Sequence, residues 1–477
     1  MALRFYNTLT RSHDEFETLE PGVVRMYACG PTVYQLPHIG NYRTFLFNDL
    51  LHRYLEWKGY RVEFVMNLTD VDDKTIDGAA ARGVSLEEFT EPVIRGFHDD
   101  LDTLGVRRAD VYPRATRHVE QMIELIDRLI ERGHAYTSED GSVYYDVSSF
   151  PGYGRLSRVD LSAMRRGERV AADEYEKGDV RDFALWKAAK DVDRAVGAVW
   201  PTPWGEGRPG WHIECSAMSM AELGETFDIH TGGEDLIFPH HEDEIAQSEG
   251  ATGKPFARYW LHVKHLLVDG EKMSKSKGNV YSLRDLLERG YTAAAVRYLV
   301  ISAHYRHELN FTFDGLETAQ SAIRRILDIQ DRLAATPVDD DAPGSELPDL
   351  ARHALEAFEA ALDDDLNVPA GLAAVFTFIR EANAALDRRA AVPAADLQEA
   401  GRALERIDDV LGVIRLARAA SGPDEEFAAW VEEKLAQRQD ARARRDFDTA
   451  DAIRGELVAA GVIVEDTPHG PRWKLAT

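Results

Sequence analysis

Two apolar segments enclose the first predicted helix of the chain. Residues 23–27, Val-Val-Arg-Met-Tyr, are typical of a buried strand, and residues 61–66 alternate like a second strand. Between them, apolar residues recur at the spacing of a helix, at Phe47, Leu50, Leu51, Tyr54 and Leu55. Gly59 then ends this helix. A strand–helix–strand unit of this kind favours a parallel sheet.

The turn before this helix brings Cys29, His38 and Gly40 to the helix N-terminus. Unpaired backbone N–H groups at such an end favour a phosphate. Gly40 has no Cβ, so we expect a ligand to approach the backbone closely there. We therefore place the chemistry of the chain in residues 27–41.

A polar cluster, Asn-Leu-Thr-Asp-Val-Asp-Asp-Lys at residues 67–74, follows the second strand. The carboxyl ends of parallel strands are where open α/β sheets bind ligands. Its adjacent carboxylates weakly suggest magnesium. The alternative is a helix N-cap followed by a solvated acidic turn.

The middle of the chain mixes helical and strand patterns. Residues from about 85 to 135 are predicted to be helical, and residues 142–147 and 258–268 are each predicted to form a strand. Residues 151–179 are charged and irregular. We interpret residues from about 120 to 205 as an insertion between two halves of one sheet.

The chain has only two cysteines, Cys29 and Cys215. Trp211 and His212 stand just before Cys215, which suggests an aromatic wall beside a thiol. Two alternatives remain open at this point: the thiols are unrelated and buried, and the tryptophan is a core residue.

A metal site is suggested further on. Pro239 suits the first turn of a helix, on which His240 and Glu244 would share a face. Zinc takes cysteine, histidine and carboxylate ligands tetrahedrally, so Cys29 and Cys215 would complete one site with this pair. His241 and Glu242 would then point elsewhere, either as partners of the metal ligands or as surface groups. The alternative is an exposed acidic helix start with stray histidines.

A lysine-rich loop follows the hairpin-type turn Asp269-Gly270. Residues 271–279, Glu-Lys-Met-Ser-Lys-Ser-Lys-Gly-Asn, present three lysines among small residues. Such a loop suits a polyphosphate, although a solvated basic loop is the alternative. It is not a Walker P-loop, because no Gly-x4-Gly-Lys-Ser/Thr pattern precedes a helix.

Composition sets broad limits. The 477 residues should form two to four domains, and 44% of them are hydrophobic. No uninterrupted apolar run of about 18 residues occurs, so we expect no membrane span and a cytoplasmic protein. The net charge of −27 argues against a nucleic-acid partner unless a local basic face exists.

The C-terminal third is predicted to be helical from Glu317 onward. A small module then opens near residue 421. Its basic side chains are Lys434, Arg438, Arg442, Arg444, Arg445, Arg454, Arg472 and Lys474. The strip at 442–445 suits phosphate contact, with solvated arginines as the alternative. Residues 461–464 and Trp473 suggest a strand pair, in which Trp473 either meets a base or packs.

Together these motifs resemble the bacterial cysteinyl-tRNA synthetases, a family of class I aminoacyl-tRNA synthetases. His38-Ile-Gly-Asn41 resembles the HIGH signature in an Asn-ending form, and Lys272–Ser276 resembles an intact KMSKS signature. The resemblance runs from about residue 3 to residue 474. The two signatures alone would indicate only class I, whereas the set of two cysteines, histidine and glutamate indicates cysteine.

The resemblance implies an α/β fold: a Rossmann-like parallel sheet with an insertion, then a helical bundle and a small C-terminal α+β module. The expected parts are two catalytic halves at 1–120 and 206–316, an insertion at 121–205, a tRNA-side bundle at 317–420 and an anticodon-binding module at 421–477.

It also implies a chemistry. ATP with Mg²⁺ would activate L-cysteine to cysteinyl-adenylate, and the cysteinyl group would pass to tRNA(Cys). His38 and Asn41, with Gly40, would hold the triphosphate, while Lys272 and Lys275 would stabilise the transition state. Catalysis would rest on positioning and charge stabilisation, without a covalent enzyme nucleophile.

The remaining implied roles concern the amino acid. One Zn²⁺ on Cys29, Cys215, His240 and Glu244 would bind the substrate thiolate, because soft sulfur favours zinc over a serine hydroxyl. Such a bond would explain why no editing domain is apparent. Thr69 and Trp211 would hold the amino acid, and Gly233 and Asp235 would face the nucleotide. We expect a monomer.

Three other functions are alternatives to this one. A ligase that passes activated cysteine to a sugar amine should lack the bundle and the terminal module. A zinc-bearing RNA-binding protein without catalysis should have degraded signatures. A zinc hydrolase would need a base aimed at metal-bound water, and no His-Glu-x-x-His arrangement occurs.

Overall fold

The computed structural model describes residues 2–159, 181–274, 277–421, 425–444, 446–467 and 470–475. The chain forms two compact units, Met1–Ile414 and Arg415–Thr477. None of the helices in these described ranges is long and apolar enough to cross a membrane.

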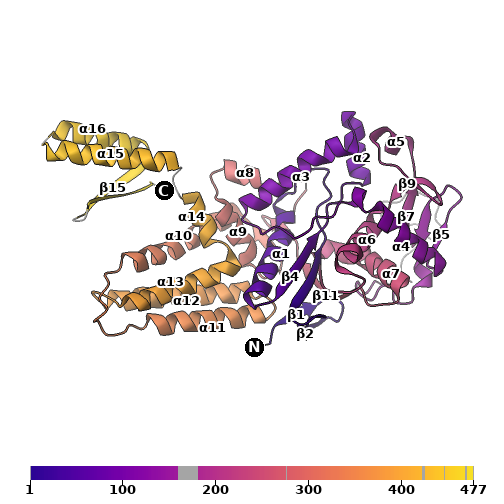
Figure 1. The fold of residues 1–477 in the computed structure, drawn as a ribbon, viewed down its shortest axis with the longest axis horizontal. Helices are drawn as coiled ribbons and strands as arrows, with labels where there is room; N and C mark the ends of the chain where they lie inside the picture. The colour runs from indigo at the N-terminus through magenta and orange to yellow at the C-terminus, as the bar shows by residue number, and fades with distance from the viewer. Residues whose placement is uncertain are drawn as a thin grey trace. The chain divides into compact units, whose positions relative to one another are not determined.

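A four-stranded parallel sheet lies at the centre of the first unit (Figure 1). Its strands, in spatial order, are β11 (Ala257–Val263), β10 (Phe227–Gly233), β3 (Val23–Ala28) and β4 (Arg61–Met66). Helix α1 (Ile39–Trp57) connects β3 to β4, as the hydrophobic pattern predicts. The predicted Rossmann-like fold class is therefore confirmed.

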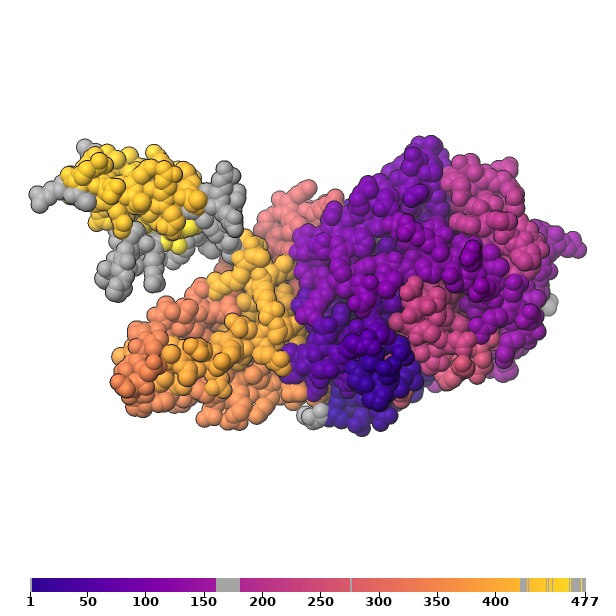
Figure 2. Space-filling model, viewed as in Figure 1, coloured from indigo at the N-terminus to yellow at the C-terminus, as the bar shows by residue number. Residues whose placement is uncertain are grey.

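The insertion contains a five-stranded antiparallel sheet. Its strands, in chain order, are β5 (Ala135–Thr137), β6 (Val143–Tyr145), β7 (Phe183–Ala188), β8 (Trp200–Thr202) and β9 (Gly205–Pro209). In Figure 2 the insertion and the helical bundle lie at opposite ends of the first unit, on either side of the N-terminal segments.

The acidic cluster after β4 is structural. Asp72 is the N-cap of α2 (Asp73–Arg82), because its side chain accepts a hydrogen bond from the Lys74 N–H at 2.9 Å. The neighbouring Asp73 carboxylate pairs with Lys187 and Arg208 of the insertion. The N-cap interpretation is therefore right, and the Asp73 carboxylate, which is 49% exposed, is also paired with the insertion.

One predicted strand is wrong. The segment 258–268 is two strands, because β11 ends at Val263 and β12 (Leu266–Val268) joins a separate sheet. In that sheet β12 pairs with β13 (Glu271–Lys272) through the predicted turn, where Asp269 and Gly270 both have positive φ. The other neighbour of β12 is β14 (Leu309–Phe311).

Most of the remaining described chain is helical. Around the sheets lie α3 (Leu86–Thr103), α4 (Val119–Glu131), α5 (Asp191–Val196), α6 (Trp211–Leu223), α7 (Glu242–Thr252), α8 (Leu283–Glu288) and α9 (Ala293–Ser302). The bundle consists of α10 (Phe313–Ala335), α11 (Leu347–Asp363), α12 (Val368–Asp387) and α13 (Ala394–Leu411), followed by α14 (Ile414–Ser421). A short hairpin of β1 (Arg4–Asn7) and β2 (Ser12–Glu15) begins the chain.

The second unit pairs two helices with a hairpin. It contains α15 (Glu425–Ala443), α16 (Phe447–Ala459), β15 (Val462–Thr467) and β16 (Gly470–Leu475). Trp473 packs against its small apolar core, and its Nε1–H donates to Glu432 at 2.8 Å. Packing is therefore the role that the structure gives Trp473. Lys434 pairs with Glu456 at 2.6 Å, Arg438 is buried, and Arg445 lies outside the described residues.

One buried arginine ties the sheet to the bundle. Arg297 of α9 is fully buried and pairs with Asp49 of α1, while its Nε–H donates to the Leu411 carbonyl at the end of α13 at 2.7 Å. Arg53 also pairs with Asp49, at 2.8 Å. Burial opposes the charge on Asp49, but the two arginines outweigh burial and hold the pKa of that carboxyl below its usual value.

We predict that Asp49→Asn lowers the free energy of unfolding at neutral pH by about 3 kcal/mol, because it leaves a buried arginine unpaired. A depressed folded pKa contributes stability above the unfolded value of 3.8, and this stability is lost as the pH falls through that range. Urea unfolding of both proteins at neutral pH and at about pH 3 should therefore show the difference shrinking in acid.

The matched control is Asp349→Asn, which breaks an exposed pair with Arg352 and should change stability by less than about 0.5 kcal/mol. Equal losses in the two variants would contradict the role given to Asp49.

Candidate metal centre and substrate cavity

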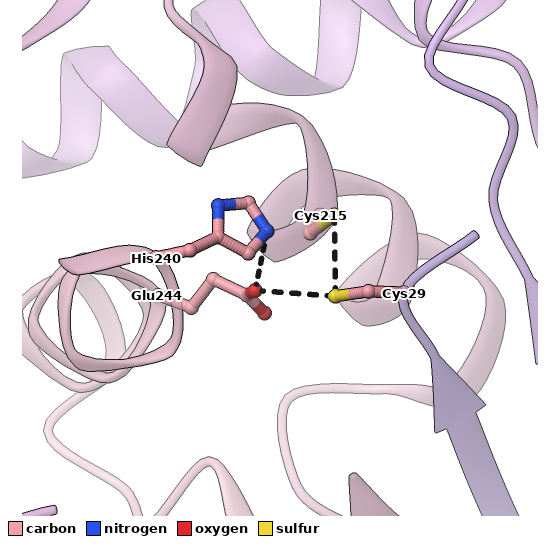
Figure 3. Close-up of side chains that lie close together, drawn as sticks. All are labelled: Cys29, Cys215, His240 and Glu244. Carbon is pink, nitrogen blue, oxygen red and sulfur yellow. Dashed lines mark hydrogen bonds and ion pairs between the residues drawn. The ribbon is translucent and has the colours of Figure 1, made fainter. Parts of the chain in front are cut away.

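Three separate parts of the chain deliver four ligand-type side chains to one buried place. Cys29 directly follows β3, Cys215 lies on α6, His240 stands just before α7, and Glu244 lies in the first turn of α7. All four are buried. Figure 3 shows them facing one another. The structure therefore brings together the complete predicted zinc set.

The distances within this group suit one tetrahedral ion. The two sulfurs are 3.9 Å apart, Cys29 Sγ is 3.6 Å from Glu244 Oε1, and that oxygen is 3.0 Å from His240 Nε2. Two sulfurs bound to one zinc at about 2.3 Å would lie about 3.8 Å apart at the tetrahedral angle. The donor atoms of all four residues lie within 4.8 Å of one another.

The pKa values of these groups indicate which protons a bound cation would displace. Burial and the nearby Cys215 raise the pKa of Cys29 well above its usual range, whereas the hydrogen bond from Cys29 lowers the pKa of Cys215 to about 6. Burial opposes a charge on His240, yet Glu244 and Cys215 outweigh it and raise its pKa to about 10. A bound divalent cation would displace the protons of Cys29 and His240, because metal ligands bind deprotonated.

Glu244 is held on both of its oxygens. Burial would raise its pKa, but His230 and His240 lower it well below the usual range. His230 Nε2 lies 2.7 Å from Oε2, the oxygen that faces away from His240 and Cys29. His230 therefore fixes the orientation of the carboxylate, as partners of metal ligands commonly do.

Further histidines surround the site, and of these the sequence indicated only His241, as a possible partner of the metal ligands. His241 Nε2 is 3.3 Å from Cys29 Sγ, so His241 faces the site and is not a surface group. A chain of contacts continues from His241 to His262 at 2.8 Å and from His262 to Thr8 at 2.8 Å. Cys29, His230, His241 and Glu244 form a second possible ligand group, but it offers one sulfur instead of two.

Glu242 points away from the metal ligands, as the sequence predicts, but it is buried. Its carboxylate accepts hydrogen bonds from the backbone N–H groups of Leu156 and Ser157, the latter at 2.7 Å. Glu242 therefore holds the segment after the insertion strand β6 rather than forming part of the solvated surface.

A cavity of about 300 Å³ opens beside the metal group, which consists of Cys29, Cys215, His240 and Glu244. Its lining includes Cys29, and Trp211 stacks on the His240 ring with centroids 4.3 Å apart. His38, Asn41, Gly233 and Asp235 also line it. The cavity therefore joins the metal group to the HIGH-like signature.

Two further predicted residues, Thr69 and Lys272, do not line this cavity. Thr69 is buried under the loop that follows β3, where its N–H donates to the Pro31 carbonyl at 3.1 Å and its hydroxyl accepts from Asn67 at 3.1 Å. It is not among the cavity-lining residues of the described chain. Lys272 is exposed on β13, and Lys275 lies outside the described residues.

One cationic residue of the cavity comes from the polar cluster at residues 67–74. Lys74 lines the cavity and lies 5.1 Å from the centre of the Tyr34 ring. The sequence placed this cluster at a ligand-binding edge of the sheet but did not single out Lys74, because the loop from 29 to 37 that faces it is distant in sequence.

The two signatures touch each other. A Cβ on Gly40 would collide with the end of the Met273 side chain, so the missing Cβ admits Met273 of the KMSKS-like loop. This differs from the expected close approach of a ligand. The Ile39 N–H also donates to the Tyr281 carbonyl at 2.9 Å. Asn41 accepts from the His38 N–H at 3.1 Å, which fixes the turn into α1.

Known families match this arrangement along most of the chain. Residues 15–321 match the model described as "tRNA synthetases class I (C) catalytic domain". Residues 357–415 match the "DALR domain" model, and residues 424–473 match "Cysteinyl-tRNA ligase anticodon binding domain".

Solved structures support the same fold. Methionyl-tRNA synthetase of Mycobacterium tuberculosis in complex with methionyl-adenylate has a TM-score of 0.60 at 17% identity, covering 87% of this chain and 94% of that one. A ternary LeuRS–tRNA–LeuAMS complex from Agrobacterium radiobacter K84 has a TM-score of 0.58 at 12% identity, covering 86% and 87%. At these identities the likeness concerns the fold alone.

Full-length relatives are much closer in sequence. The cysteine–tRNA ligase of Symbiobacterium thermophilum is 48% identical over 483 residues and covers 100% of both chains. That of Chlamydia pneumoniae is 46% identical over 472 residues, covering 99% of this chain and 98% of the relative. With a catalytic domain and an anticodon-binding module that both match, the chain belongs to the cysteine–tRNA ligase family of class I aminoacyl-tRNA synthetases.

Proposed function

We propose that the protein activates L-cysteine with ATP and transfers it to tRNA(Cys), with a zinc ion on Cys29, Cys215, His240 and Glu244 selecting the substrate thiol. The observation that carries the proposal is the convergence of these four side chains beside the cavity, which Cys29 lines together with the HIGH-like signature. Family membership supports the overall ligase reaction, and the geometry supports the choice of cysteine.

The first step is nucleophilic displacement at phosphorus. A carboxylate oxygen of cysteine attacks the α-phosphorus of ATP, the bond to the bridging oxygen breaks, and pyrophosphate leaves. A ribose hydroxyl at the tRNA end then attacks the acyl carbon, and AMP leaves. Neither step needs a covalent enzyme nucleophile, so the protein acts by positioning and by stabilising charge.

The cavity residues supply that positioning. His38 and Asn41 stand at the N-terminus of α1, where the helix dipole favours an anion, and Lys74 adds a positive charge to the wall. Contact between Gly40 and Met273 holds the KMSKS-like loop near the same helix end. Lys272 and Lys275 on that loop would approach the ATP phosphates, which Mg²⁺ would accompany.

A zinc ion held by Cys29, Cys215, His240 and Glu244 would supply a Lewis-acidic position for the substrate sulfur. Trp211 stacks on His240 at the border between the cavity and the metal group, so an amino acid held there would place its side chain toward the two cysteines. Gly233 and Asp235 line the cavity and would face the nucleotide. Thr69 would act from behind the wall, through the loop that it fixes at Pro31.

The alternatives gain no support. The chain retains a helical bundle and a module that matches an anticodon-binding family, which a sugar-amine ligase would not require. Its cavity keeps the histidine and asparagine of the HIGH-like signature, which an inactive RNA-binding relative would not need.

We predict that the protein catalyses ATP–pyrophosphate exchange with cysteine and at least about 100-fold more weakly with serine, because a metal–thiolate bond discriminates better than packing. Radiolabelled pyrophosphate exchange, followed by charging of tRNA(Cys), measures both halves of the reaction. Normal exchange without tRNA charging would favour the sugar-amine alternative.

Cobalt substitution tests the metal directly. In the Co²⁺ protein, cysteine should intensify the thiolate-to-cobalt absorption, whereas serine should leave it unchanged. Cys215→Ser should reduce bound zinc at least about tenfold by elemental analysis, since it removes a ligand. The control is Ser219→Ala on the same helix, where the hydroxyl donates to the Ser216 carbonyl. An unchanged spectrum with cysteine would contradict thiolate binding even if the metal is present.

A further inference from the structure

A second cleft lies directly beside the substrate cavity. It has a volume of about 390 Å³, and Leu36 lines both hollows. Its remaining lining residues come from α3 and α8: Pro92, Arg95, Gly96, His98, Asp99 and Arg284. The reaction described above makes no use of this cleft.

The cleft depends on a glycine inside a helix. A Cβ on Gly96 would lie 2.7 Å from Leu36 Cδ2 and 3.3 Å from Arg284 Nη2. Glycine in a helix interior costs about 1 kcal/mol relative to alanine. Here it allows the loop before α1 and the guanidinium of Arg284 to pack directly on α3, which sets the wall between the two hollows.

Two arginines carry the positive charge of the lining. Arg95 is exposed and makes no hydrogen bond or direct ion pair within the part of the chain that the structure describes, although its charge acts on the Glu91 carboxyl one turn earlier. Arg284 is half exposed and meets Asp100 through Nε, at 3.4 Å. His98 already contacts Arg108, and among the described residues Asp99 is the single acidic side chain in the lining. Two guanidinium groups are therefore available to a ligand on a chain of net charge −27.

The position of the cleft indicates its ligand. Arg284 stands on α8, whose N-cap Ser282 forms a β-bridge with His38 at the start of α1. A molecule in the cleft therefore lies next to the place where the acyl group would be transferred. Guanidinium groups bind phosphate oxygens in bidentate fashion. A nucleic-acid duplex is too wide to enter the adjoining cavity, whereas a single strand with splayed bases is not.

We propose that this cleft binds backbone phosphates of the single-stranded 3′ end of the tRNA through Arg95 and Arg284. The assignment rests on the proposed function, because it concerns the second substrate of the same site. It adds a guide for the strand that carries the accepting ribose into the cavity.

The test compares the full-length wild type with Arg95→Gln, Arg284→Gln and the double variant. Exchange of pyrophosphate with cysteine should stay within about twofold of wild type, since the cleft does not touch the amino acid or ATP. The double variant should lose at least about tenfold in kcat/KM for tRNA. The dependence of log K for tRNA on log salt should become shallower by about 0.7 for each phosphate that is no longer neutralised.

A shortened tRNA locates the binding site on the substrate. The double variant and the wild type should bind tRNA(Cys) lacking its four unpaired 3′ nucleotides equally well, because the phosphates in question are gone. Arg61→Gln is the matched control, since it removes an exposed arginine at the start of β4, the opposite end of the strand from residues 67–74.

Three outcomes would overturn the assignment. One is wild-type charging and salt dependence in the double variant, and another is equal weakening with intact and shortened tRNA. The third is a loss in the double variant that Arg61→Gln reproduces. A wild-type protein without cysteine-dependent exchange would instead overturn the proposed function. Arg95 makes no hydrogen bond or direct ion pair with any other described residue, so Arg95→Gln should leave folding unchanged. A loss of tRNA binding in this single variant therefore cannot come from a folding defect at Arg284.

Discussion

The site depends on a carboxylate that water does not reach. Glu244 is fully buried, and a charge taken out of water is costly unless it is paired on all sides. One of its oxygens meets Cys29 and His240, and the other meets His230. Cys29 directly follows β3, His230 lies within β10, and His240 stands just before α7, so pairing this one carboxylate brings three parts of the chain together. A divalent cation would complete the compensation, which is why the proposed metal also stabilises the arrangement that selects the amino acid.

Close backbone packing links the two signature loops. Gly40 leaves room for Met273, and the backbone of Ile39 bonds to Tyr281 beyond the lysine loop. Because β12 and β13 hold the start of that loop in a sheet of their own, it begins from a fixed place and returns to the helix N-terminus. In the proposed reaction, the lysines of this loop could then approach the phosphates of ATP without any rearrangement of the parallel sheet.

The sequence predicted the regular elements and the four ligand-type side chains, and it missed several other long-range contacts. Period-two and helical patterns located β3, α1 and β4, and an i, i+4 pair with two cysteines located the metal group. Burial of His230 and His241 could not be read, because histidine occurs at surfaces and in interiors alike. The break after Val263 was missed because both strands are apolar, and only their different partners separate them. Lys74 enters the cavity through a long-range contact that no local spacing encodes.

Net charge is a poor guide to the partner of this chain. An excess of acidic groups repels RNA, but salt screens that repulsion beyond a Debye length of about 8 Å, so contact is decided by the charges within that distance. Other arginines near α3 are already neutralised, as Arg108 is by Asp102 and Arg114 by Glu91. Arg95 has no direct ion pair among the described residues, although its charge acts on Glu91, and Arg284 meets Asp100 at 3.4 Å through one nitrogen, so both guanidinium groups keep donors for phosphate oxygens where the cleft opens. Repulsion by the acidic surface would discourage unspecific RNA, whereas a strand that enters through this opening would meet attraction next to the reacting groups.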